Sequence, residues 1–417
     1  MYSTKRKQIF TTLLMLVFSQ TWATGEEYVL GPDSLPREGI PKGTVTEHTW
    51  DTSNIYPDTT SEYWVYVPAQ YNKSEPACLI VFQDGQAYLH DKGSVRATNV
   101  LDNLIHKGEM PVTIAIFINP SRKEGSRSQR DVQYVTTNDT YARFLIEEII
   151  PEVAKEYNLT DDAAGRAACG MSDGGVCSFT LGWERPDFFS KVISHIGSYV
   201  RLKQGGEYPL RIRATRGNPK PIRVFLQDGY NDMNSSLGSW TLSNLDMQAS
   251  LQFARYDHRL DMGPGVHDLR HGGAILPDTL RWIWRDYPGV KGADDPPDYD
   301  TILGQWDITA NLFGRISNTV LTLSLDGDTL VGKLVDEKAD EIEIVDISLE
   351  EDVLTYEYIP PPAQAGFAKG DKPKSPETAK NHMATWLRVS GNTLEGAVAS
   401  TNRSDFELDY IVTGKKR

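Results

Sequence analysis

Short apolar runs alternate with amphipathic segments between residues 63 and 288 of the chain. Six of these runs are nearly continuous in apolar residues, which is typical of strands buried on both faces of a sheet. They read "EYWVYVP", "CLIVFQD", "VTIAIFIN", "RAACGM", "KVISHIG" and "IRVFLQDG". Because strands and helices that alternate along a chain form a mostly parallel sheet with helices on both faces, the pattern predicts an α/β fold with a doubly wound sheet.

Three further segments have the residue spacing of helices. The first, "TYARFLIEEIIPEVAKEYN", repeats apolar residues about once per helical turn. In the second, "LSNLDMQASLQFARY", one face is formed by Leu242, Leu245, Ala249 and Phe253. The third, "LPDTLRWIWRDYP", is expected to begin near Pro277, because the N–H that proline lacks is not needed in a first turn.

The character of the sequence changes after Pro288. The stretch "GVKGADDPPDYD" is polar and contains proline, as linkers do, and beyond it alternating segments replace helical ones. Turn formers recur there in "DGDTLVG", "SGNTLEG" and, more loosely, "EEDVLTY". We therefore expect an α/β domain at 24–288, a linker at 289–298 and an all-β domain at 299–417, built of antiparallel hairpins as a small barrel or sandwich.

The N-terminal residues have the pattern of a secretory signal peptide. Lys5, Arg6 and Lys7 precede the apolar run "IFTTLLMLVF", and a small-residue cleavage site ends at Ala23. The alternative is an uncleaved membrane anchor, which we disfavour because the run is short for a bilayer span. The expectation is a signal peptide at 1–23 and a periplasmic or secreted protein that has no membrane contact after cleavage.

Charge and cysteine content narrow the function classes. The formal net charge of −14 becomes about −17 without residues 1–23, which contain three basic and no acidic residues. Such an acidic chain is not expected to bind nucleic acid. Three cysteines, Cys78, Cys169 and Cys177, are too few for a disulfide framework and are expected to be packed thiols. No glycine pattern for a dinucleotide or a phosphate is present, so no cofactor is expected.

Ser172 lies in "ACGMSDGGVC", where an apolar run ends at Gly170 and Gly174 leads into a helical segment. A G-x-S-x-G sequence between a strand and a helix is typical of a tight turn that exposes the serine oxygen above the sheet. This context predicts that Ser172 is a nucleophile. The alternative is an ordinary strand-to-helix junction that needs glycine for its left-handed backbone.

A serine nucleophile requires a histidine base and a carboxylate that orients it. The run "IRVFLQDG" continues as "YNDMN" and offers Asp228 and Asp232. We favour Asp232, because it lies in the loop beyond Gly229, from which a side chain can turn toward the active face. Asp228 is the alternative, although it can also belong to the strand end, and either aspartate could simply cap the turn.

Three histidines, His258, His267 and His271, lie between these aspartates and the linker. His258 starts a run that resembles an edge strand and is expected to be partly exposed. His267 follows "GPG" in a loop that can reach over the sheet, so we favour it as the base. His271 lies nearer a helix start and is kept as the alternative. The spacing of His267 and His271 could suit a metal only in a helix, and the glutamate of the zinc-protease signature is missing, so no metal site is predicted.

Ester chemistry also needs two donors for the developing oxyanion. The candidates are the backbone N–H groups of Asp173, directly after Ser172, and of Gln86, where Gly85 permits a close turn. The carboxylate of Asp173 would repel an oxyanion if it faced the substrate. We therefore expect it to point sideways, along the N-terminus of the following helix.

The sequences "FQDGQAY", "GMSDGG", "LQDGYNDMN" and "GVHDLRHGGAILPDTLRWIWRDYP" resemble the α/β-hydrolase esterase family that includes enterochelin esterases, esterase D, feruloyl and acetylxylan esterases and mycolyltransferases. The resemblance covers roughly residues 45–288. It implies an α/β-hydrolase fold with Ser172 as nucleophile, Asp232 as acid and His267 as base. It also implies that the N–H groups of Gln86 and Asp173 bind the oxyanion.

Two positions depart from the family pattern. The residue after the nucleophile is usually apolar or small but is Asp173 here, and the glycines that commonly precede the histidine are Gly265 and Val266. Both departures bear on rate and substrate fit. The C-terminal segments "LGQWDITA" and "DYIVTGKKR" resemble small lipocalin-like β-domains that are appended to secreted bacterial enzymes.

These observations predict a secreted serine ester hydrolase without a cofactor, acting on acyl or aromatic esters, with carbohydrate-linked esters favoured. One alternative is a catecholate siderophore esterase of the enterochelin type. Such esterases often carry an N-terminal β-domain, and the region before Val45 is small for one. Another alternative, from a different class, is a non-catalytic protein that binds a glycan or a protein on a hydrolase scaffold.

Overall fold

The computed structural model describes residues 28–125, 128–200, 204–293, 298–312, 314–350, 352–359, 383–400 and 409–417. The expected signal peptide, residues 1–23, lies outside the described residues. Among the residues that the structure describes, none of the helices is both long and apolar enough to cross a bilayer.

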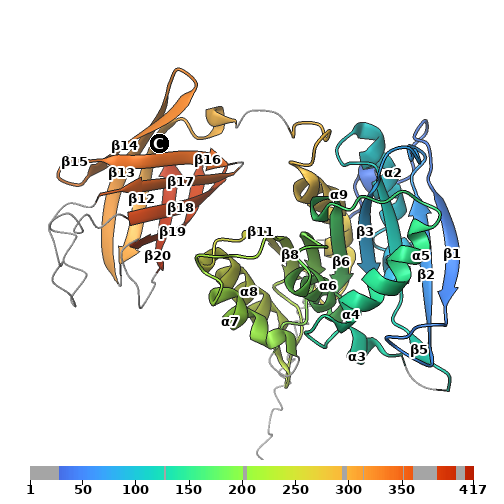
Figure 1. Ribbon diagram of the computed structural model, residues 1–417. Coiled ribbons are helices and arrows are strands. Elements are labelled where there is room, and N and C mark those ends of the chain that lie inside the picture. The colour runs from blue at the N-terminus through green and yellow to red at the C-terminus, as the bar shows by residue number, and fades with distance from the viewer. Residues whose placement is uncertain are drawn as a thin grey trace, which may run out of the picture.

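The first sheet has the strand order β1-β2-β4-β3-β6-β7-β8-β11, with β5 paired to β2 (Figure 1). Strands β1 and β2 are antiparallel to their neighbours, and β3, β4, β6, β7, β8 and β11 run parallel. The prediction of an α/β-hydrolase fold is therefore confirmed. The strands are β1 (Thr44–Trp50), β2 (Thr59–Val67), β3 (Cys78–Gln83), β4 (Thr113–Ile118), β5 (Arg122–Lys123), β6 (Arg166–Met171), β7 (Lys191–His195), β8 (Arg223–Gly229) and β11 (Asp257–Gly263).

Helices cover both faces of this sheet. They are α1 (Gly85–Leu89), α2 (Ala97–Lys107), α3 (Arg130–Gln133), α4 (Thr140–Phe144), α5 (Ile150–Ala154), α6 (Asp173–Glu184), α7 (Tyr208–Arg213), α8 (Trp240–Phe253) and α9 (Arg270–Trp284). A π-helical turn, Leu145–Ile149, joins α4 to α5, so the first predicted helix is present as one continuous segment.

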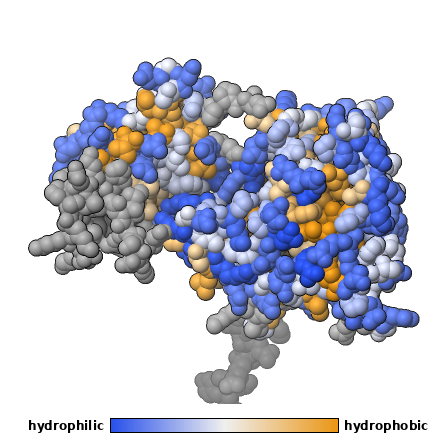
Figure 2. Space-filling model, in the orientation of Figure 1, coloured by the Kyte–Doolittle hydropathy of each residue, from blue (hydrophilic) through white to orange (hydrophobic). Residues whose placement is uncertain are grey.

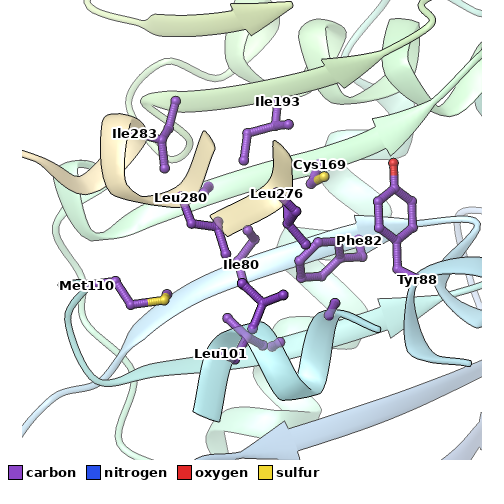
Figure 3. Close-up of a cluster of buried hydrophobic side chains, with 14 of the residues drawn as sticks. Ile80, Phe82, Tyr88, Leu101, Met110, Cys169, Ile193, Leu276, Leu280 and Ile283 are labelled. Atoms are coloured by element: carbon purple, nitrogen blue, oxygen red, sulfur yellow. The ribbon is translucent and has the colours of Figure 1, made fainter. Parts of the chain in front are cut away.

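The core is divided by the sheet into two layers, and β3 shows how. Ile80 and Phe82 point to the side of α2 and α9, where they meet Leu276 and Leu280 (Figure 3). Leu79 and Val81, which alternate with them along the strand, point to the other side and pack under α4, α5 and α6. Side chains of a strand alternate between faces, so a strand buried on both sides must be apolar throughout, as β3 is.

The predicted apolar face of α8 is wrong. Leu242 is 67% exposed, and the residues that face the core include Trp240, Met247 and Leu251. Asn244 is also buried, and its amide donates to the Gly197 carbonyl and the Asp228 carboxylate. Because a polar residue occupies the inner face for its hydrogen bonds, apolar spacing alone selected the opposite face.

The predicted start of the last helix is also wrong. Helix α9 begins at Arg270, and Pro277 lies inside it rather than in its first turn. A proline there removes one backbone hydrogen bond of the helix. Burial of Leu276, Leu280 and Ile283 in the core compensates for that loss.

A second sheet is antiparallel, with the order β15-β14-β13-β12-β20-β19-β18-β17-β16. Its edges meet because β15 and β16 are separated by one residue in the chain, so the sheet curls into a nearly closed barrel around an apolar core (Figure 1). Two of the predicted turns contain Gly327 and Gly391, both at positive φ. The strands are β12 (Gly304–Leu312), β13 (Arg315–Asp326), β14 (Thr329–Asp336), β15 (Glu341–Ile342), β16 (Ile344–Glu350), β17 (Val353–Tyr358), β18 (Met383–Ser390), β19 (Thr393–Ser400) and β20 (Asp409–Lys416).

The barrel contacts the first sheet at the beginning of β11. The Arg388 guanidinium donates to the His258 carbonyl, and the rings of His258 and Trp386 stack. Asp409 accepts from Arg216 and Arg255. His258 is consequently buried, which corrects the expectation of partial exposure, and burial lowers the pKa of its imidazole to about 4. Away from such contacts, hydrophilic residues cover most of the visible surface (Figure 2).

The orientation of α8 is testable with two equal truncations in the same helix. We expect Leu251→Ala to lower the free energy of unfolding by about 2–5 kcal/mol, because it leaves a cavity in the core. Leu242→Ala, on the exposed face, should change it by less than about 0.5 kcal/mol. Urea denaturation of both variants measures the difference, and a larger loss for Leu242→Ala would show that the helix is turned the other way.

Candidate active site

Ser172 lies in a sharp turn between β6 and α6, with φ 55° and ψ −120°. Its N–H donates to the carbonyl of His195 at the end of β7 (2.9 Å). The flanking glycines leave no room for a side chain: a Cβ on Gly170 would lie 2.3 Å from the Gly174 carbonyl oxygen, and one on Gly174 would lie 2.9 Å from an oxygen of Asp84. The sequence folds this way because only small residues allow strand and helix to approach so closely around a residue with positive φ.

The structure brings Ser172, His267 and Asp232 together at the edge of the sheet where the parallel strands end. His267 Nε2 lies 2.9 Å from Ser172 Oγ, and its Nδ1 lies 2.7 Å from Asp232 Oδ1. The Asp232 side chain is fully buried, and the His267 ring is 21% exposed. The indole of Trp240 meets the His267 ring edge-on. This arrangement can carry a proton from the serine oxygen to the imidazole while the carboxylate holds the ring.

Asp228, near the end of β8, and Asp232, in the loop that follows β8 (the acid loop), have different surroundings. Asp232 Oδ1 accepts from His267 and from the Met233 N–H. Burial raises the pKa of Asp232, but its hydrogen bonds with His267, Asp228 and Met233 outweigh this effect and hold the pKa below the usual value. Asp228 is completely buried at the end of β8, and burial together with Asp232 raises its pKa to about 8.

Burial and the neighbouring carboxylate of Asp232 favour a proton on Asp228. Asp232 Oδ2 is buried and can be hydrogen-bonded by its neighbour only if Asp228 carries a proton, since two carboxylates cannot donate to each other. Asp228 is itself held by the Gly229 N–H (2.8 Å) and the Asn244 amide (2.9 Å). The directions of the two pKa shifts therefore favour a charged Asp232 beside His267 and a neutral Asp228 next to it.

The alternative base, His271, points elsewhere. It lies in the first turn of α9, where it contacts Asp261 (3.1 Å) and Gln227 (3.0 Å) and stacks on Tyr28. His267 lies before the helix, so the two rings do not share a helical face. Among the described residues, no group of three or more histidine, cysteine or acidic side chains is placed to hold a metal ion.

Asp173 and Gln86 flank Ser172 as possible oxyanion donors. Asp173 is the first residue of α6, and Gln86 lies in the first turn of α1, just after β3. The Gln86 N–H points at the side-chain oxygen of Asn119 at 3.2 Å. A Cβ on Gly85 would lie 2.3 Å from the backbone of β4, so this close turn requires glycine.

Arg130 explains the direction of the Asp173 carboxylate. Its guanidinium donates to Asp173 (2.9 Å) and forms a two-pronged ion pair with Asp84 (2.7 and 2.9 Å). Burial lowers the pKa of Arg130, but these carboxylates raise it overall, so the group stays charged. The Asp173 carboxylate thus points sideways, as expected, but its partner is the Arg130 guanidinium of α3. The sequence predicts only the N-terminus of α6 as its partner. Arg130 links Asp84, which precedes α1, to Asp173 of α6, and so connects the two segments that carry the candidate oxyanion donors.

Three residues at the site are missed by the sequence reasoning. Ser198 lies just after β7, and Asn119 lies just after β4. Arg130 is the first residue of α3. The ends of β4 and β7 could have been identified from their apolar runs, and side chains just beyond parallel strands meet at one edge. Arg130 gave no such signal, because it opens a four-residue helix within the long segment after β4, and the sequence does not determine the course of that segment.

The role of Arg130 can be tested through its two partners. Asp173→Asn should lower kcat/KM by less than about tenfold, because an amide oxygen can still accept from Arg130 and Asp84 retains its pair. Arg130→Gln should cost more than Asp173→Asn, since it removes a cation that contacts both Asp84 and Asp173. Steady-state kinetics on one soluble ester compares them, and a hundredfold loss in Asp173→Asn would contradict the sideways placement.

The neutral role of Asp228 predicts a pH effect. A folded-state pKa above the unfolded value contributes stability at low pH that is lost as the pH rises from about 4 through 8. Asp228→Asn, which keeps a donor for Asp232, should therefore gain in urea midpoint relative to the native chain between pH 5 and pH 9. The control is Asp246→Asn, at an exposed site on α8. A midpoint difference that does not vary with pH would mean that Asp228 is not protonated.

Comparison with known proteins identifies the family. A model of the family described as "Putative esterase" matches residues 57–273, which is more than half of the chain. Among solved structures, an enterobactin esterase from Shigella flexneri shares 19% identity, with 59% of this chain and 60% of that chain covered and a TM-score of 0.49. A ferric enterobactin esterase from Salmonella typhimurium shares 19%, with 59% of each chain covered and a TM-score of 0.48.

A ferulic acid esterase from the anaerobic fungus Anaeromyces mucronatus shares 18% identity, with 64% of this chain and 96% of that chain covered and a TM-score of 0.47. The chain thus spans less than two thirds of the length of the enterobactin esterases that it matches. The family match over more than half its length shows that the chain belongs to this family of esterases.

Proposed function

We propose that the protein is a secreted serine ester hydrolase that uses Ser172, His267 and Asp232 as a catalytic triad. The observation that supports this proposal most is the unbroken line of hydrogen bonds from Asp232 through His267 to Ser172 Oγ. Ser172 Oγ attacks the ester carbonyl while His267 Nε2 takes its proton and returns it to the leaving alcohol. Water then releases the acyl group by the same route, and no cofactor is required.

The oxyanion is bound by the N–H groups of Gln86 and Asp173. Asn119 Oδ1 accepts from the Gln86 N–H in the resting site, so the carbonyl oxygen of the substrate takes over this donor when it binds. Exchange of an amide oxygen for an oxyanion strengthens the hydrogen bond, because the acceptor gains charge during the attack. Asn119 thus keeps the donor satisfied between turnovers.

The acyl group is proposed to be apolar or aromatic. Three apolar or aromatic residues near the triad in the sequence are exposed. Tyr230 and Met233, in the same loop as Asp232, are 64% and 40% exposed, and Val266, next to His267, is 42% exposed. Apolar side chains left in water at the rim of a site favour an apolar ligand. We favour carbohydrate-linked acyl or aromatic esters, and a catecholate siderophore ester of the enterochelin type is the second candidate.

A panel of esters separates these substrates. Acetyl and feruloyl esters of a sugar and a catecholate trilactone, tested side by side, should give the highest kcat/KM for a sugar-linked ester. A preference for the trilactone of tenfold or more would favour the siderophore assignment. Secretion is tested separately, by locating the native chain after cell fractionation and sequencing its N-terminus, which should begin after Ala23.

A non-catalytic protein on the same scaffold is the alternative from another class. A fluorophosphonate probe decides between the two, because it reacts covalently with an activated serine and leaves an inactive one unmodified. The catalytic proposal expects labelling of the native chain. A folded chain that never reacts, and whose Ser172→Ala variant binds its ligand equally well, would favour the binding protein.

Substitution of the triad tests the individual roles. Ser172→Ala and His267→Ala should each lower kcat by at least about 10³-fold with little change in thermal midpoint, since both residues act in the same proton transfer. Asp232→Asn should lower it as well, because an amide cannot stabilise the imidazolium. The matched control is Ser235→Ala, an exposed serine three residues beyond Asp232. Retention of more than a tenth of the native kcat by Ser172→Ala would contradict the assignment.

A further inference from the structure

We propose that Ser198, oriented by Trp240, donates a hydrogen bond to Ser172 Oγ and so positions the nucleophile for attack. The inference rests on the proposed function of the same site. Ser198 Oγ lies 3.1 Å from Ser172 Oγ, and the indole N–H of Trp240 lies 3.1 Å from Ser198 Oγ. Ser198 is 1% exposed and Trp240 is 4% exposed, so water does not compete freely for these contacts.

The direction of donation follows from the chemistry of the four groups. An indole N–H can only donate, so Ser198 Oγ is its acceptor. The charged Asp232 accepts from His267 Nδ1–H, which leaves Nε2 as an acceptor for the Ser172 hydroxyl. Ser172 has then used its only proton, and its oxygen can only accept from Ser198. One direction, from Trp240 through Ser198 and Ser172 to His267, satisfies every partner.

The backbone around Ser198 is built to hold this position. The Ser198 N–H donates to the Ser172 carbonyl (3.1 Å), while the Ser172 N–H donates to the His195 carbonyl (2.9 Å), so one segment after β7 holds the nucleophile from both sides. Between them, Ile196 adopts a positive φ of 44°, which is a costly conformation for a β-branched residue. Strain of this kind persists where the surroundings impose it, and it clusters at functional sites.

Helix α8 connects this segment to the acid loop. Trp240 and Asn244 lie one turn apart on its inner face, where Trp240 reaches Ser198 and Asn244 reaches both the Gly197 carbonyl (2.9 Å) and Asp228 (2.9 Å). The same helix therefore contacts both Ser198, beside the serine, and Asp228 of the aspartate pair. A single rigid helix can in this way hold the nucleophile and the acid at a fixed distance and orientation from each other.

The consequence for the reaction concerns the rotamer and the charge of Ser172. A hydrogen bond from Ser198 restrains the Ser172 side chain to the rotamer that faces His267 and leaves the remaining lone pair for the carbonyl carbon. As His267 removes the proton, negative charge grows on Ser172 Oγ, and the bond from Ser198 becomes charge-assisted. Ser198 thus contacts the reacting oxygen itself, whereas Trp240 is a positioning residue that acts through Ser198.

The test compares Ser198→Ala with the matched control Ser178→Ala, a buried serine of α6 whose hydroxyl has no hydrogen-bond partner among the described residues. For Ser198→Ala we expect kcat on a soluble ester and the rate constant of fluorophosphonate inactivation to fall together by about tenfold, with KM within about twofold. A purely structural role would not lower both rate constants in parallel at an unchanged KM and thermal midpoint. Ser178→Ala should leave both rate constants within about twofold.

Trp240→Phe provides a second variant in case Ser198→Ala fails to fold, because it removes only the N–H and keeps a ring beside His267. It should lower the same two rate constants about threefold or more. If the native chain reacts with the probe and both variants remain within twofold of it, the proposed function stands and this inference is overturned. The inference also fails if Ser178→Ala lowers the rate constants as much as Ser198→Ala. A native chain that does not react would instead refute the proposed function.

Discussion

The whole site depends on the backbone turn at Ser172, where a non-glycine residue is held at positive φ. This conformation is unfavourable by itself, and three features maintain it: a hydrogen bond from the Ser172 N–H to His195, one from Ser198 to the Ser172 carbonyl, and glycines at the points of closest approach. Because β6, β7 and β8 are parallel neighbours, the turn, the Ser198 segment and the acid loop all emerge at one edge of the sheet. The parallel sheet therefore determines which loops can meet the serine.

Much of this could be predicted from the sequence, because the signals were local. Continuous apolar runs marked each parallel strand, and the glycines around Ser172 marked the turn. Helix α8 could not be oriented in this way, since Asn244 is buried for its hydrogen bonds while Leu242 is exposed. The start of α9 was missed because a proline inside a helix is tolerated only when packing compensates, and packing is not visible in the sequence. The raised pKa of Asp228 depends on a burial that only the folded chain defines.

The barrel and the candidate site lie at opposite ends of β11. Arg388 and Trp386 contact the beginning of this strand at His258, whereas the loop with His267 follows its other end at Gly263. A strand of seven residues separates these points by about 20 Å. These contacts of the described part of the barrel thus lie at the end of β11 away from Ser172.

The central claim is that ester cleavage passes through a covalent bond to Ser172 Oγ. The most direct measurement is acid quenching of the native chain during the first turnovers of an activated acetyl ester, followed by mass spectrometry of the digested peptides. The account predicts a transient acetyl group on Ser172, and its accumulation should be greatest when the second step is slow. Rapid turnover of the ester with no acyl group on the peptide that contains Ser172 would contradict the account.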